Sequence, residues 1–326
     1  MNGIRKISRL LNAIPCIALL GFAAACTEGI IIDTWVEEET IIINSVLTDT
    51  PIYPAGANDD FRMPVYYSSG YFTPDYFDNK ITGADIKISS SFGNSYKLKE
   101  ISEGWYFHNN ESGESGGIYV SPGETVTLDF FVDEGINPVY GNFSVSETVP
   151  EPVKLDSISI EPAKILGMNT YNVGIYAQDP PGEDNYYLFL ITVKDSFGNI
   201  KYHTDRITSY ILLDDSVSDG RYFDNMVINT SLSSAHNDGS SSGIIYLAPG
   251  DEVIVYMCSI TNGYYRFLTQ CQSAKNGTNP FFGGPPSNIF SNIPGGAGYF
   301  TGYCHTTAGA VVPESTRMDV DTKVTE

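Results

Sequence analysis

Hydrophobic and polar positions alternate over much of the chain after residue 40. Residues 126–132 and 171–177 each place apolar side chains at every second position. A period of two, carried by β-branched and aromatic residues, is typical of strands with one buried face. Residues 186–193 are apolar at nearly every position, which predicts a central strand covered on both faces. The pattern therefore predicts a mostly β fold.

One segment has a helical period instead. Tyr264, Phe267, Leu268 and Cys271 recur at i, i+3, i+4 and i+7, which is the spacing of one helix face. Asn and Gly at 276–277 provide a stop signal. We predict a short helix near residues 263–275, and we expect it to cover a sheet edge or the end of a barrel.

Two short strings occur twice, in the same order. Ser-Phe-Gly-Asn at residues 91–94 recurs at 196–199, and Pro-Gly at 122–123 recurs at 249–250. Each string is typical of a tight turn between two strands. The repetition predicts two domains of related topology, although generic hairpins can also resemble each other by chance. The second copy is longer, and its extra residues, around 212–243, look like a polar surface excursion.

Prolines near residue 150 mark the join between the two copies. The predicted fold class is all-β, with two tandem β-sandwich domains of immunoglobulin-like or transthyretin-like type. The first domain covers residues 36–150. The second covers residues 151–312 and includes the short helix. Residues 313–326 form a polar tail.

The N-terminus has the three-part pattern of a signal peptide. Basic residues precede a mainly apolar stretch at 10–22, and three alanines follow before Cys26. This resembles a bacterial lipoprotein signal, in which residues 1–25 are removed, Cys26 carries the lipid and residues 26–38 form a tether. Such signals usually have Leu three positions before the cysteine, where this chain has Ala23. The alternative is a secreted protein cleaved after Ala25 with a free thiol.

Charge narrows the range of partners. The chain has 18 Lys and Arg against 39 Asp and Glu, a net charge of −21. Nucleic acid is a poor partner for such a chain, because phosphate binding needs a basic surface. A hydrophobic content of 42% is enough to bury a core, so a disordered chain is also excluded.

No catalytic or cofactor motif stands out. The four histidines, at 108, 203, 236 and 305, are scattered, and the sequence contains no Gly-x-Ser-x-Gly, HExxH or phosphate-loop motif. We therefore predict that the protein is not an enzyme and binds no cofactor, with a hydrolase of dispersed site as an alternative.

Acidic pairs and cysteines give no firm site. The pairs at 59–60 and 214–215 could help to bind calcium, but no EF-hand spacing exists, so we predict solvated acidic faces and no metal site. Cys258, Cys271 and Cys304 allow at most one intramolecular disulfide.

Aromatic residues give the best binding signal. Residues 51–82 contain four prolines and look too irregular for a strand. Seven aromatic side chains in this stretch either pack locally or meet a partner or ligand. They are Phe61, Tyr66, Tyr67, Tyr71, Phe72, Tyr76 and Phe77.

The C-terminal region carries a family resemblance. Asn-Pro-Phe at 279–281, Ser-Asn-Ile at 291–293, Gly-Gly at 295–296 and Gly-Tyr-Phe at 298–300 follow one another. This order resembles the signature of a Bacteroidota lipoprotein family, domain of unknown function 4249. The resemblance implies an outer-membrane lipoprotein that acts as a non-enzymatic accessory or binding component beside a TonB-dependent nutrient-uptake receptor. It names neither a ligand nor a membrane face.

A second class of function stays open at this point. A lipidated two-sandwich chain is also compatible with a fimbrial or adhesin subunit. Such a subunit would need a processing arginine early in the first domain, and Arg62 is the candidate.

Overall fold

The computed structural model describes residues 39–52, 61–68, 79–108, 116–135, 137–204, 207–233, 245–276 and 289–314. The predicted signal peptide, Cys26 and the predicted tether lie outside these residues. Within the described ranges, no helix is long and apolar enough to cross a membrane. The part of the chain from Glu39 onward forms one compact unit.

The described residues fold mainly into strands, with one α-helix and one turn of 3-10 helix. The all-β fold class with a single short helix is therefore confirmed. The strands are β1 (Ile41–Thr48), β2 (Arg62–Tyr67), β3 (Asp85–Ser90), β4 (Ser95–Ser102), β5 (Trp105–His108), β6 (Thr125–Val132), β7 (Gly141–Thr148), β8 (Leu155–Ile165), β9 (Met168–Gln178), β10 (Tyr186–Lys194), β11 (Ile200–His203), β12 (Ile211–Asp214), β13 (Tyr222–Ser233), β14 (Tyr246–Leu247), β15 (Glu252–Ile260) and β16 (Ala297–Val311). The helices are η1 (Ile207–Ser209) and α2 (Asn262–Asn276).

Two sheets contain these strands. The larger has twelve strands in the order β11-β10-β15-β16-β1-β2-β5-β4-β3-β6-β7, with β12 also paired to β10. The smaller has four strands in the order β14-β13-β9-β8.

A four-strand motif occurs twice in the larger sheet. Strands β4-β3-β6-β7 and strands β11-β10-β15-β16 follow each other in the same order. The Ser-Phe-Gly-Asn strings form the β3–β4 and β10–β11 turns, where Gly93 and Gly198 have φ of 96° and 85°. The repetition read from the sequence thus corresponds to a repeated strand order.

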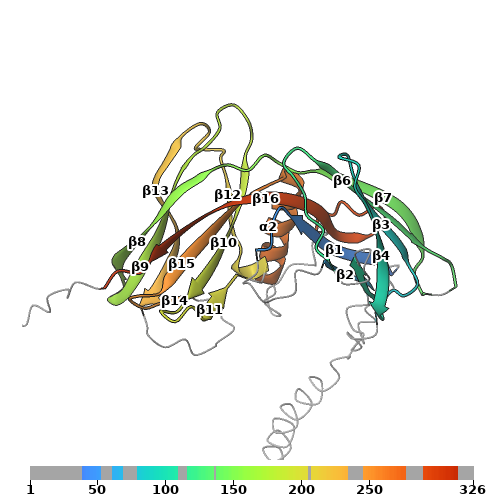
Figure 1. Cartoon of the computed structure of the whole chain (residues 1–326), viewed down its shortest axis with the longest axis horizontal. Coiled ribbons are helices and arrows are strands. Elements are labelled where there is room, and N and C mark those ends of the chain that lie inside the picture. Colours follow the sequence, from blue (N-terminus) through green and yellow to red (C-terminus); the bar gives the residue numbers. More distant parts are fainter. Residues whose placement is uncertain are drawn as a thin grey trace, which may run out of the picture. The chain divides into compact units, whose positions relative to one another are not determined.

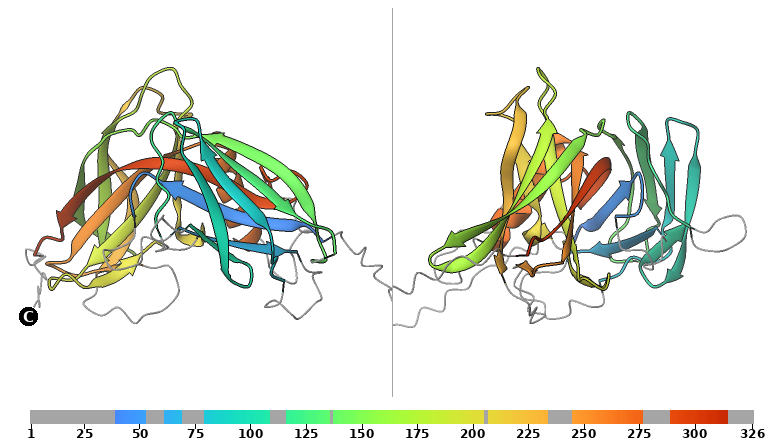
Figure 2. Two further views of the ribbon diagram at one scale, coloured as in Figure 1. Left: turned by 45° about the vertical axis from the view of Figure 1, so that its right-hand side comes forward. Right: turned by 60° about the vertical axis from the view of Figure 1, so that its left-hand side comes forward.

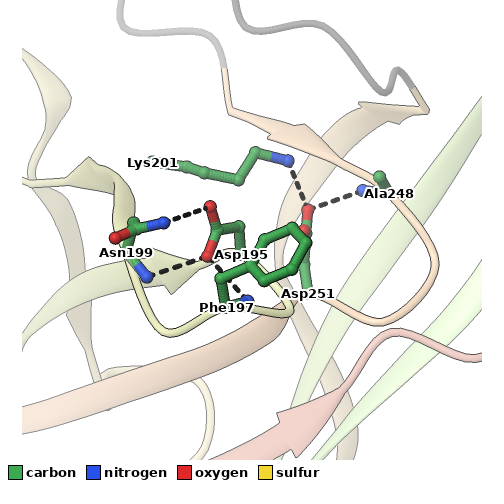
Figure 3. A network of polar contacts seen from close by, with 6 residues as sticks. All are labelled: Asp195, Phe197, Asn199, Lys201, Ala248 and Asp251. Carbon is green, nitrogen blue, oxygen red and sulfur yellow. Dashed lines mark hydrogen bonds and ion pairs between the residues drawn. The ribbon is translucent and has the colours of Figure 1, made fainter.

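Both Pro-Gly turns have a buried carboxylate that accepts a hydrogen bond from a backbone N–H of the turn. After the first turn, buried Glu124 accepts the N–H of Ser121 at 2.7 Å. After the second, buried Asp251 accepts the N–H of Ala248 at 2.8 Å. Asp251 also pairs with the Lys201 ammonium at 2.5 Å, and Figure 3 shows this pair beside the β10–β11 turn.

Strand β16 joins the two motifs. Its residues 297–303 pair in parallel with β1, and its residues 304–311 pair antiparallel with β15. Figures 1 and 2 show β16, in red, beside the blue strand β1. The predicted domain boundary at residues 150 and 151 therefore divides the sequence at a point where one continuous sheet includes strands from both sides. The number of domains stays a prediction.

Three hydrophobic cores hold the fold. One lies among β1 to β7, and a second lies between the small sheet and β10, β15 and β16. The third lies between α2 and the other face of β10, β15 and β16. Tyr187 and Phe189 belong to the second core while Leu188 and Leu190 belong to the third, so β10 is covered on both faces, as predicted.

Three sequence predictions need correction. Helix α2 packs on the face of the sheet through Tyr264, Phe267 and Leu268, and not at an edge or a barrel end. Residues 51–82 do contain a strand, β2. Pro64 pairs with Trp105 of β5 and has no partner in β1. The N–H of the next residue, Val65, donates to Gly104 beside β5, so the N–H that Pro64 lacks would point to the unpaired side. The stretch at 212–243 contains β13, which pairs along β9 and buries Phe223.

Candidate functional site

A cavity of about 680 Å³ opens on the face of the large sheet that carries α2. It lies where β1 ends at Thr48, opposite Tyr303, and where β15 takes over as the partner of β16. The lining residues come from β1, β2, the segment between β5 and β6, the second four-strand motif, the segment between β11 and β12, and α2. They are Asn44, Ser45, Val46, Thr48, Pro51, Ile52, Phe61, Arg62, Gly117, Ile118, Tyr119, Leu190, His203, Thr204, Tyr210, Tyr264 and Tyr303.

Aromatic rings dominate this lining. Five of the residues are aromatic, namely Phe61, Tyr119, Tyr210, Tyr264 and Tyr303. The ring centroids of Tyr264 and Tyr303 are 6.3 Å apart in a stacked arrangement, and both side chains are buried in the α2 core. Rigid rings of this kind offer flat contact surfaces with few rotamers to immobilise on binding. The cavity volume lies in the range that suits a small-molecule ligand.

Polar groups at the cavity are fixed by neighbours. The Nδ1 atom of His203 lies 2.7 Å from the hydroxyl of Thr192, which is itself buried. The guanidinium of Arg62 lies over the ring of Phe107 at 5.4 Å from its centroid. Asn44 accepts the backbone N–H of Tyr299 at 3.1 Å. These contacts orient the polar side chains before any ligand arrives.

The charge of the lining differs from that of the chain. None of the described residues that line the cavity is acidic, although the chain has 39 Asp and Glu. Arg62 is the charged side chain among the described lining residues, and His203 and four tyrosines are titratable. Among the described residues, no carboxylate of the lining would attract a cationic ligand, so the described lining suits a neutral or anionic ligand.

The residues of the predicted aromatic cluster do not all lie at the cavity. Phe61 lines the cavity, and it also packs against the core among β1 to β7. Tyr67 packs on that same core, and Tyr66 lies in the pairing between β2 and β1. Tyr71, Phe72, Tyr76 and Phe77 lie outside the described residues. Sequence reasoning missed Tyr119, Tyr210, Tyr264 and Tyr303 as cavity residues, because they come from distant segments whose proximity depends on the fold.

A group of three carboxylates lies elsewhere in the described part of the chain. Asp179, Asp215 and Asp219 have oxygen atoms within 4.8 Å of one another, and the first two are buried. Burial raises the pKa of Asp215, and the charges of Asp179 and Asp219 raise it further. These oxygens could hold a hard cation such as Ca²⁺. Of the predicted acidic pair at 214–215, only Asp215 belongs to this group.

Each carboxylate of this group already accepts a hydrogen bond. The N–H of Gly220 donates to Asp179 at 2.9 Å, that of Asn185 to Asp215 at 2.9 Å, and that of Gly182 to Asp219 at 2.7 Å. The hydroxyl of Tyr187 also donates to Asp179. The group thus fastens the loop before β10 to the turn after β12.

The three described cysteines are free thiols. Cys258 and Cys304 are buried, and Cys271 on α2 is partly exposed. Burial raises the pKa of Cys304 to about 12, so this thiol is a poor nucleophile at neutral pH. His305 beside it has its Nδ1 2.7 Å from the carboxylate of Asp49. The contacts of Cys258, Cys304 and His305 are those of side chains packed in a core.

The fold and the cavity define an all-β protein with an aromatic cavity where one strand joins two repeated motifs. The model of the family described as Domain of unknown function (DUF4249) matches residues 33–308, so the chain belongs to this family. No curated protein matches the chain.

Several solved structures match the chain, and one of them shows the extent of the similarity. It is a DUF4785 family protein from Legionella pneumophila, with 7% sequence identity and a TM-score of 0.23. The similarity covers 68% of this chain and 51% of that chain, so this chain spans about half the length of that protein.

Proposed function

We propose that this protein is a lipid-anchored, non-enzymatic binding protein of the outer membrane. It holds a small molecule in the aromatic cavity and acts as an accessory component of a TonB-dependent nutrient-uptake receptor. The aromatic cavity is the observation that carries this proposal. It combines a volume of about 680 Å³ with five rings and, among the described residues, a lining without acidic side chains.

The lining also indicates the kind of ligand. Aromatic faces favour a ligand with a ring or another flat apolar surface. The tyrosine hydroxyls, Asn44 and Thr48 offer hydrogen bonds along that surface. Since Arg62 carries a positive charge and none of the described lining residues is acidic, the proposed ligand is neutral or anionic.

The contacts of two described histidines, His203 and His305, support a non-enzymatic role, because neither activates a neighbouring hydroxyl or thiol. His203 is paired with Thr192, whose side chain is buried. His305 contacts Asp49, and the pKa of the adjacent Cys304 thiol is raised by burial. Neither arrangement presents an activated nucleophile to the cavity.

Binding in the cavity can be tested with a fluorescent probe. We expect 8-anilinonaphthalene-1-sulfonate, an anionic aromatic dye, to bind the intact protein with increased fluorescence. Tyr119→Ser should weaken binding because Tyr119 lines the cavity and is 42% exposed, so its loss leaves the core in place. Tyr140→Ser is the matched control, because Tyr140 is 58% exposed and is not among the lining residues. Equal binding by both variants would remove the cavity from the proposal.

The anchor rests on the sequence around Cys26. A diacylglycerol group and an acyl chain together are enough for stable membrane attachment. We expect cells fed labelled palmitate to yield a labelled product, and we expect Cys26→Ser to abolish both the label and membrane retention. A Cys26→Ser protein that still carries the palmitate label would contradict the anchor.

The partner can be tested by native purification from outer membranes in mild detergent. Co-purification of a TonB-dependent receptor supports the accessory role. Self-polymers, or a chain trimmed at Arg62, would favour the fimbrial alternative instead. Arg62 begins β2, which pairs with both β1 and β5, so such trimming would separate β1 from an internal strand.

A further inference from the structure

The turn between β8 and β9 exposes apolar side chains. Leu166 is 94% exposed, and its neighbours Ile165 and Met168 are 45% and 50% exposed. Ile165 pairs with Met168, so Leu166 and Gly167 form a two-residue hairpin turn. Both turn residues have positive φ, 49° for Leu166 and 82° for Gly167.

Leu is an unfavourable residue for this position. Two-residue turns with positive φ at both positions strongly favour Asn-Gly, because Asn tolerates the left-handed region better than Leu. Leu166 is therefore both strained and almost fully in water. Neither the turn geometry nor packing within the described residues explains why Leu stands there, so its side chain is available to another surface.

A second apolar tip lies at the β10–β11 turn. Phe197 is 89% exposed. The turn that carries it is rigid, because Asp195 accepts the N–H groups of Phe197 at 2.9 Å and of Asn199 at 2.8 Å. Figure 3 shows the Phe197 ring beside this network. Phe197 is thus presented to its surroundings by a turn that holds its shape.

Both tips lie at the same end of the molecule's β8–β16 half. Thr170 of β9 pairs with Leu232 of β13, and Leu232 pairs with Tyr246 of β14. The Pro-Gly turn follows β14 directly, and a Cβ at Gly250 would lie 3.8 Å from the Cβ of Ser196 in the β10–β11 turn. Figure 1 shows the β8–β9 turn, β14 and β11 at this end.

Two lysines at this end are paired with carboxylates, while Asp195 of the β10–β11 turn accepts N–H groups of its own turn. Lys201 pairs with Asp251, and Lys194 pairs with Glu252. Lys164, next to the Leu166 tip, is exposed and makes no ion pair with any residue that the structure describes. The immediate surroundings of the tip therefore offer a cation in a chain of net charge −21.

We propose that this end of the protein contacts a lipid surface, with Leu166 and Phe197 inserted among the head groups and Lys164 beside their phosphates. Two separate protruding tips with a flanking lysine suit a soft interface, in which each apolar side chain inserts independently and the ammonium stays at the polar level. A protein partner would instead need a continuous apolar patch at the centre of the contact. This inference goes beyond the ligand cavity and does not depend on it.

The test uses the intact chain and phosphatidylcholine vesicles with bromine on their acyl chains, which quench tryptophan fluorescence on contact. The variants are Leu166→Trp, Phe197→Trp and Phe92→Trp, each compared with the parent chain to subtract its own tryptophans. Phe92 is the matched control, because it is 62% exposed in the equivalent Ser-Phe-Gly-Asn turn of the other motif. We expect a loss of fluorescence at positions 166 and 197 and none at 92.

Several outcomes would overturn the proposal. Unquenched tryptophan at 166 and 197 would show that the tips do not meet lipid, and would turn attention to a protein partner. Equal quenching at all three positions would show unspecific adsorption. Failure of the dye-binding test in the cavity would leave this result unchanged, so the two proposals fail separately.

Leu166→Asn provides a second measurement. Asn suits a left-handed turn residue, so we expect the variant to unfold at a higher denaturant concentration than the parent chain. The same variant should lower the vesicle partition coefficient by about tenfold or more, because an apolar side chain no longer inserts. A less stable Leu166→Asn variant would show that Leu166 serves the fold. A variant that binds vesicles as well as the parent would show that Leu166 does not insert into lipid.

Discussion

Replacement of Gly298 by Ala tests whether β16 holds the two motifs together. Gly298 pairs with Ile43 of β1 and has a φ of 98°. A Cβ at this position would lie 2.1 Å from the backbone oxygen of Ile43 and 2.8 Å from Oδ1 of Asn44. Since one of these atoms is backbone within a paired strand, β1 and β16 would have to move apart.

The expected loss can be worked from two contributions. An alanine in the left-handed region costs about 1–2 kcal/mol relative to glycine. Separation of the two strands weakens about two hydrogen bonds, at about 1 kcal/mol each. The free energy of unfolding should therefore fall by about 3–4 kcal/mol, a large part of the total for an ordinary protein.

Gly309→Ala is the matched control in the same strand. Gly309 lies in the half of β16 that pairs with β15, has no positive φ, and a Cβ there would lie 3.5 Å from the backbone oxygen of Val253. This is an ordinary contact, so we expect a change within about 0.5 kcal/mol. Urea unfolding followed by circular dichroism measures both variants. A Gly298→Ala protein as stable as the parent, or an equal loss in Gly309→Ala, would refute the reasoning.

Three further predictions concern buried groups. Lys201→Met should lower the free energy of unfolding in urea by about 3 kcal/mol, because it leaves the buried carboxylate of Asp251 without its cation. Lys194→Met should cost at most about 0.5 kcal/mol, because both partners of the Lys194–Glu252 pair are partly exposed. Equal losses in the two variants would contradict this prediction. Burial alone would raise the pKa of Asp49, but the hydrogen bond and charge of His305 outweigh it and lower the pKa. Stability from this carboxylate is thus present above the pKa of about 4 of the unfolded chain and is lost as the pH falls through the lower folded value, so Asp49→Asn should flatten acid unfolding below about pH 4. Ellman's reagent should modify Cys271 in the folded protein well before Cys258 and Cys304, which are buried with raised pKa values; fast modification of all three thiols would mean that the core opens.

Local chemistry made much of the fold predictable. Residues 186–193 are apolar on both faces because β10 lies between two cores, so the pattern carries the burial directly. The glycines of the Ser-Phe-Gly-Asn turns have the positive φ that such turns require. The helical spacing from Tyr264 to Cys271 predicted α2 within a residue at each end.

Pairing partners were not predictable in the same way. Pro64 interrupts the strand pattern of β2, and nothing local shows that the side of the strand to which its missing N–H would point is unpaired there. Strand β13 has an irregular burial pattern, because register shifts interrupt its pairing with β9. A sequence pattern reports which face is buried, but it does not report such irregularities.

The cavity depends on contacts between segments that are far apart in the sequence. Strand β1 and the first half of β16 are about 255 residues apart in the sequence, as in the contact of Asn44 with Tyr299. Composition of residues 51–82 pointed to aromatic binding, and Phe61 does line the cavity. The other four rings come from segments between Tyr119 and Tyr303, and only the folded sheet brings them together.

The change of partner along β16 explains why a cavity forms at this place. Tyr303 is the last residue of β16 that pairs with β1, and Cys304 is the first that pairs with β15. Because β1 ends at Thr48, the sheet surface beside it is left to side chains from the second motif, from α2 and from the segment between β5 and β6, and these line the cavity. A ligand bound there would contact β1 and β16 on one side and Leu190, His203 and Tyr210 on the other. Gly298→Ala should therefore weaken dye binding as well as stability, since it displaces β1 against β16, whereas Gly309→Ala should leave both unchanged. Dye binding that survives in Gly298→Ala under conditions where the protein stays folded would show that the cavity does not depend on this join.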